Sequence, residues 1–197
     1  MVKPIISITI AVILALTAAP TAAEPWRALF RPAKIMSDMF FDRCVAAMAS
    51  GEEIDATGLD DITDTYDVAR NSRQWISKRV HVTLSYDVVQ DPNDADTEWR
   101  TCKVEWAGGL RGRGYTLDHG LVLARYDAWA HVGTAAGVLF DASCPDHDGW
   151  EHYRRHILAL DGGYPLGVAL FHKSDLDMLM LIAGEVPAEY LDDYPCS

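Results

Sequence analysis

Hydrophobic and polar residues alternate from residue 79 to residue 88 of the stretch 79–89, which is the clearest pattern in the chain. One side carries only apolar residues: Val80, Val82, Leu84, Tyr86 and Val88. A period of two is typical of a β-strand with one buried face, and no helix fits it. Residues 100–106 repeat the alternation, with Cys102, Val104 and Trp106 on one side. We predict that the two stretches form a hairpin, because residues 91–96 are rich in turn-forming Asp, Asn and Pro.

Three other segments have the spacing or the end signals of helices. A first helix is predicted to begin at Ser37 as its N-cap and to end at Gly51, with apolar residues spaced mostly at three and four. A short amphipathic helix is expected over residues 59–70. A third helix is predicted to begin at Thr116 as its cap and to end at Gly133.

The remaining apolar runs, at residues 138–140, 153–160 and 166–171, predict further strands of a meander. Residues 176–182 are equally consistent with a strand or a helix, because a short apolar run does not reveal its period. The predicted fold class is α+β: an antiparallel sheet with helices packed on one face and two disulfides. The sequence has no internal repeat and no linker, so residues 24–197 are expected to form a single globular domain.

Residues 1–23 have the features of a secretory signal peptide. Lys3 precedes an apolar run, and small residues stand before Glu24 at the expected cleavage site. A membrane-spanning helix needs about 20 apolar residues, and Pro20 interrupts the run before that length. We therefore expect cleavage after Ala23 and a secreted or periplasmic protein that is not inserted in the membrane.

The chain has four cysteines, and none of them forms a C-x-x-C pair. An even number of cysteines in an exported chain predicts two disulfides. Three connectivities are compatible with the sequence. We favour Cys44 with Cys102, since both lie on apolar sides of predicted elements, and this choice leaves Cys144 to pair with Cys196.

The protein is acidic, with a formal net charge of −12. Binding to nucleic acid or to anionic lipid depends on basic patches that displace counterions, and an acidic surface disfavours it. We therefore expect no nucleic-acid partner. A chain of 197 residues also buries enough surface to fold without a metal or a cofactor.

Three of the seven histidines lie within residues 144–156. His152 and His156 are four residues apart and share one side in either a helix or a strand, so they are candidate metal ligands with His147 as a third. Tyr153 stands where a zinc protease has its glutamate, which argues against that chemistry. The competing interpretation is a polar loop and the solvated side of an edge strand, on which Arg154 repels a cation.

The sequence contains no G-x-S-x-G nucleophile motif, and we assign no catalytic residue. The predicted function is that of an exported binding or interaction module without a cofactor, whose partner is a protein or a small molecule. Aromatic residues near segment edges, Trp26, Trp75 and Trp99, are candidate contacts. The alternative is a metal-binding protein or a metal-assisted hydrolase that uses the region from His147 to His156.

Overall fold

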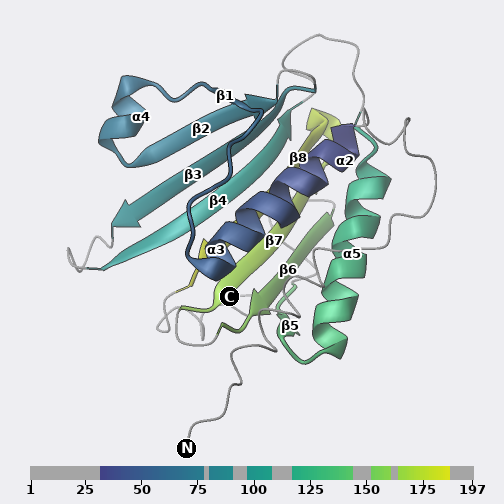
Figure 1. Ribbon diagram of the computed structural model, residues 1–197. Helices are drawn as coiled ribbons and strands as arrows, with labels where there is room; N and C mark the ends of the chain where they lie inside the picture. Colours follow the sequence, from purple (N-terminus) through teal and green to yellow (C-terminus); the bar gives the residue numbers. More distant parts are fainter. Residues whose placement is uncertain are drawn as a thin grey trace, which may run out of the picture.

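The computed structural model describes residues 32–77, 80–90, 97–107, 117–143, 152–160 and 164–186, without the side chains of Ala69 and His152. It contains an eight-stranded antiparallel sheet with helices (Figure 1). The strands are β1 (Asp60–Asp61), β2 (Ser72–Ser77), β3 (Val82–Gln90), β4 (Glu98–Ala107), β5 (Leu139–Asp141), β6 (His152–Leu158), β7 (Leu166–Lys173) and β8 (Met178–Glu185). The helices are α2 (Pro32–Asp38), the π-helix η2 (Met39–Val45), α3 (Ala46–Ser50), α4 (Thr65–Ala69), α5 (His119–Ala135) and the 3-10 turn η4 (Ser174–Leu176). The α+β class is thereby confirmed.

The strand order is β1-β2-β3-β4-β8-β7-β6-β5. The last strand, β8, lies in the middle of the sheet between β4 and β7. It therefore joins two halves that are each built from consecutive strands, β1 to β4 and β5 to β7. Pairing between β4 and β8 places residues about 80 positions apart in the chain side by side, as for Thr101 and Gly184.

The predicted pairing of the two alternating stretches is confirmed. β3 and β4 are antiparallel neighbours, and Leu84 lies opposite Val104 in the register. The first strand begins at Val82 rather than at residue 79, because the chain turns just before it: His81 has a positive φ of 55°, and its amide donates to the Ser77 carbonyl at 2.8 Å. The strand β2 before this turn was not predicted.

α2, η2 and α3 follow one another without a break and lie with α5 on the same side of the sheet (Figure 1). The prediction that Ser37 caps this helix is wrong. The helix begins at Pro32, a residue suited to a first turn because it has no amide hydrogen to leave unpaired. Ser37 is therefore fully buried inside the helix, where its hydroxyl donates to the Ala33 carbonyl at 2.8 Å. Gly51 ends the helix as predicted, with a positive φ of 75°.

α5 extends beyond the glycine that was expected to end it. A Cβ added to Gly133 would lie only 2.1 Å from Leu139 Cδ1, so this glycine allows α5 to approach β5 closely. The helix continues to Ala135. Its cap is Asp118, whose carboxylate accepts from the Leu121 amide at 3.0 Å, and the predicted cap Thr116 lies outside the described residues.

Strand pairing determines the structure of two further segments, one of which was predicted wrongly and one of which was left open. Residues 59–70 were expected to form one helix, but only Thr65–Ala69 is helical, and Asp60–Asp61 pairs with β2 as the edge strand β1. The run at 176–182 belongs mainly to strand β8, which Asp177 precedes in the left-handed conformation with φ 44°.

Helices and sheet enclose one hydrophobic core, crossed by the disulfide between Cys44 of η2 and Cys102 of β4. This pairing was predicted and is confirmed. The two residues are 58 positions apart, so the disulfide restricts a long loop of the unfolded chain and is expected to contribute about 4 kcal/mol. Cys144 and Cys196 lie outside the described residues, and one disulfide is therefore shown where two were predicted. No helix within the described ranges is long and apolar enough to span a membrane.

Candidate functional site: a pocket on the sheet face opposite the helices

Two facing glycines create a hollow on the side of the sheet away from the long helices. Gly167 of β7 lies opposite Gly184 of β8 in the register, and Thr101 of β4 lies on the other side of Gly184. Successive residues of a strand point to opposite faces, so these three positions share the face that does not carry the core residues Val168 and Ala183. Glycine has no side chain to fill the space above the backbone.

The hollow forms a pocket of about 390 Å³. Its lining comes from four adjacent strands and the residue after β8: Trp99, Thr101, Tyr153, Arg155, Gly167, Ala169, Phe171, Ile182, Gly184, Glu185 and Val186. The small residues Gly167, Gly184 and Ala169 form the floor of the pocket. Ala169 lies two positions after Gly167 on β7, between Ile182 of β8 and Arg155 of β6. Binding sites for small molecules commonly have volumes of about 300–1,000 Å³ and mostly apolar walls, so the size suits a small ligand.

Aromatic rings stand at two sides of this floor. Tyr153 of β6 lies opposite Phe171 of β7, and their ring centroids are 4.9 Å apart. Trp99, at the start of β4, lines the other end of the pocket. Of the three candidate contact tryptophans, Trp99 lines this hollow, Trp75 packs against the core, and Trp26 lies outside the described residues.

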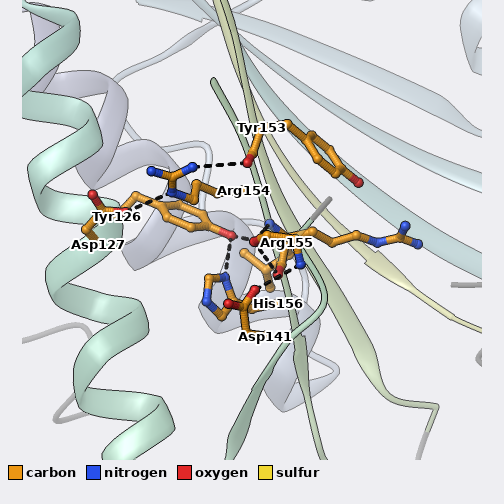
Figure 2. A network of polar contacts seen from close by, with 9 residues as sticks. Tyr126, Asp127, Asp141, Tyr153, Arg154, Arg155 and His156 are labelled. Atoms are coloured by element: carbon orange, nitrogen blue, oxygen red, sulfur yellow. Dashed lines mark hydrogen bonds and ion pairs between the residues drawn. The ribbon is translucent and has the colours of Figure 1, made fainter. Parts of the chain in front are cut away.

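The charged residues that line the pocket are Arg155 and Glu185. The Glu185 carboxylate accepts from the Arg100 amide at 2.8 Å and from the Arg100 Nε at 3.0 Å. The hydrogen bond between the two side chains raises the pKa of Arg100, and the positive charge of Arg100 balances the negative charge of Glu185. Figure 2 shows the side chains of Tyr153 and Arg155 on one side of β6 and that of His156 on the other.

On the helix side of β6, a buried hydrogen-bond network joins three elements (Figure 2). The Tyr126 hydroxyl of α5 donates to the Val168 carbonyl of β7 at 2.9 Å and lies 3.1 Å from Nδ1 of His156. Burial raises the pKa of Tyr126 well above its ordinary value, and it lowers the pKa of His156. Both groups are therefore held neutral, inside an aromatic cluster with Phe41 and Trp129. This arrangement satisfies buried polar groups between the helix layer and the sheet.

The structure changes the interpretation of the histidine-rich segment. β6 is not an edge strand, since it lies between β5 and β7, and His156 is only 7% exposed rather than solvated. Residues four apart in a strand are separated by about 13 Å along its axis, which is the backbone separation of His152 and His156 in β6. His147 and the side chain of His152 lie outside the described part of the chain, so metal binding by these residues stays a prediction. Among the described residues, no group of three or more His, Cys, Asp or Glu side chains is placed to hold a metal ion.

The pocket was missed by reasoning from the sequence. The available signal was a glycine within each of two strand-like runs, which often marks a place where another group approaches the backbone. The two glycines form a pocket only because the register of β7 and β8 places Gly167 opposite Gly184. The strands that meet there are distant in the chain, and no local pattern gives their register.

Comparisons with known proteins do not identify a relative. No protein-family model matches the chain, and neither the curated proteins nor the solved structures contain a significant match. Function is therefore inferred from the geometry of the pocket.

Proposed function

We propose that this protein is a non-catalytic binding protein that holds a small ligand in the pocket on the sheet face opposite the helices. The ligand has a flat apolar or aromatic body and an acidic group. The observation that supports this proposal is the hollow above Gly167 and Gly184, with aromatic rings at its sides and Arg155 at its edge.

The composition of the central strands supports a bound partner on this face. β7 and β8 have the sequences LGVALFHK and MLMLIAGE, which are apolar on both sides over most of their length. An antiparallel sheet with one solvated face normally alternates apolar and polar residues, as β3 does with Thr83, Ser85 and Asp87. Apolar residues on the second face of β7 and β8 therefore favour contact with an apolar group.

Arg155 determines the proposed chemistry of the ligand. A guanidinium group binds a carboxylate through two parallel hydrogen bonds, and these bonds are stronger where the surroundings are apolar. The protein as a whole has a net charge of −12, so an acidic ligand is repelled elsewhere on the surface. The aromatic rings of Trp99, Tyr153 and Phe171 then favour a flat apolar body over an aliphatic one.

We further propose that the protein acts after export, with residues 1–23 removed. The Cys44–Cys102 disulfide supports an oxidising compartment, because cytosolic proteins rarely keep structural disulfides. N-terminal sequencing of the natively localised protein tests this part: the first residue should be Glu24, and an intact Met1 would contradict it.

A matched pair of arginine variants tests the ligand class. Indole-3-acetate and its neutral amide serve as probes, and isothermal titration calorimetry reports binding. We expect the carboxylate to bind more tightly than the amide, and Arg155→Gln to weaken only the carboxylate by about 10- to 100-fold, since a hydrogen bond to a charged group contributes about 1.5–3 kcal/mol. Arg154→Gln is the control, because this neighbour lies on the other side of β6, with Nε 3.6 Å from Asp127.

Ala169→Leu provides a second test that does not depend on charge. The larger side chain fills the floor of the pocket without a change to the buried core. It should abolish binding of both probes while the melting temperature changes little. Equal binding by the wild-type protein, Arg155→Gln and Ala169→Leu would contradict the proposed function.

A further inference from the structure

Two histidines meet near the end of β7, on the face of the sheet opposite the pocket. His119 is the first residue of α5, and His172 is the second-last residue of β7. The Nδ1 atom of His119 lies 2.7 Å from the Nε2 atom of His172, and the rings are nearly perpendicular, with an interplanar angle of 70°. Successive residues of a strand point to opposite faces, and Phe171 lines the pocket. The next residue, His172, therefore lies on the helix side of the sheet, where it is buried.

A carboxylate lies at the other ring nitrogen of His119. The Oδ1 atom of Asp177, in the turn before β8, is 3.1 Å from His119 Nε2. The oxygen lies off the N–H direction, so the buried Nε2 has no aligned hydrogen bond among the described residues. A small rotation of either side chain would align it, because the Asp177 side chain is 40% exposed.

We propose that His119 and His172 bind a divalent transition metal ion, with Asp177 as the carboxylate that orients His119. Metal-ligating histidines almost always donate their second ring N–H to a carboxylate or a carbonyl, and this places Asp177 in its expected position. Imidazole nitrogens suit zinc, copper and nickel rather than calcium or magnesium. The site differs from the pair His152 and His156, since its two rings come from separate elements that bring them together.

The observed geometry requires only a small adjustment to accept an ion. Two nitrogen ligands at about 2.0–2.1 Å from tetrahedral zinc are separated by about 3.3 Å, so the rings must move apart by about 0.6 Å. Without metal, one ring donates a hydrogen to the other. With metal bound, His172 keeps a single ring hydrogen on Nδ1, and its Nε2 faces the ion. Water completes the coordination, because the His119 side chain is 20% exposed.

The charges around His119 have both signs, and together they favour binding of a cation. The site is next to the N-terminus of α5, where the helix dipole disfavours positive charge. Two carboxylates oppose this effect: Asp118, which caps the helix, and Asp177. Their full charges exceed the partial charge of a helix end, which is about half an elementary charge.

Zinc titration of the full chain after treatment with a chelator tests the site, with calorimetry and melting temperature as readouts. We expect one zinc ion per chain and a higher melting temperature in the wild-type protein, both lost in His119→Ala. His131→Ala is the matched control, because His131 is on the same helix, α5, and is exposed. It should bind zinc as tightly as the wild type.

The variant Asp177→Asn distinguishes a metal site from a purely structural contact between the two histidines. It does not alter the buried core, because the Asp177 side chain is 40% exposed. Loss of an orienting carboxylate typically weakens metal binding by about 10- to 100-fold, and we expect a change of this size. The proposal is wrong if the wild-type protein gains no stability from zinc, or if His119→Ala and His131→Ala bind zinc equally. Neither result would affect binding at the pocket on the opposite face.

Discussion

The two faces of the sheet differ although the same strands form both. On the helix side, β7 and β8 present large aliphatic residues that are fully buried, such as Val168, Leu170 and Leu181. On the other side the same strands present glycine and alanine in the floor of the pocket, with Ile182 and aromatic residues around it. The first face is filled by its own chain, whereas the second is shaped around a hollow. This difference is the basis of the proposed function.

Removal of the disulfide should give the largest effect on the helix-side face. The double variant Cys44→Ala/Cys102→Ala frees η2 from β4 and restores the entropy of the unfolded chain, at a cost of about 4 kcal/mol in the free energy of unfolding. Urea denaturation measures it, with the reduced wild-type protein as a control. A loss below about 1 kcal/mol would show that this cross-link does not hold the helix layer on the sheet.

Neighbouring residues of β8 compare the two faces directly. Leu181→Ala removes a side chain that is 0% exposed and should lower the free energy of unfolding by about 3 kcal/mol, because it leaves a cavity under the helices. Ile182→Ala removes a half-buried side chain of the pocket and should cost about 1 kcal/mol. Denaturation curves of both variants measure the difference. Equal losses would mean that the pocket face is packed as a core.

The buried network between the helix layer and the sheet should contribute less. Tyr126→Phe keeps the ring but leaves the Val168 carbonyl and His156 without their partner, and we expect a loss of about 1–3 kcal/mol. Tyr66→Phe is the control, since Tyr66 is 60% exposed and its change should stay within about 0.5 kcal/mol. Similar values for both variants would contradict a structural role of this network.

The pH dependence from His156 is the smallest expected effect. Burial holds the pKa of His156 below its ordinary value of 6.5, and Arg154 lowers it further against the opposite influence of Asp141 and Asp127. Between this lowered pKa and 6.5, the unfolded chain binds more protons than the folded protein, so the free energy of unfolding falls as the pH drops. His156→Gln should reduce this slope, and the exposed control His131→Gln should not. Stability curves between pH 4 and pH 8 provide the measurement, and an unchanged slope in His156→Gln would contradict the assignment.

Local patterns predicted part of this fold well. The alternation of β3 and β4 and the apolar positions of Cys44 and Cys102 depend on neighbouring residues, and these predictions are confirmed. Ser37 was misjudged because the helix already begins at Pro32, so that its hydroxyl bonds to the Ala33 carbonyl inside the helix. Gly133 was misjudged because it serves a tertiary contact, the close approach of α5 to β5. Tertiary context overrides such preferences.

The candidate site could not be predicted for a related reason. The pocket depends on the register of β7 with β8 and of β8 with β4, which are pairings between distant parts of the chain. The pair His119 and His172 likewise depends on the position of α5 against the sheet. By contrast, the candidate site at His152 and His156 was inferred from local spacing alone, and it stays a prediction because the His152 side chain lies outside the described residues.

Methyl NMR during a titration with indole-3-acetate tests the central claim most directly. Adjacent residues of two strands report on opposite faces: Ala169 and Ile182 line the pocket, whereas Val168 and Leu181 lie in the core. The proposed function predicts saturable shifts at Ala169 and Ile182, with small changes at Val168 and Leu181. Shifts confined to the core methyl groups, or no saturable shift at any of the four, would contradict a binding site on this face.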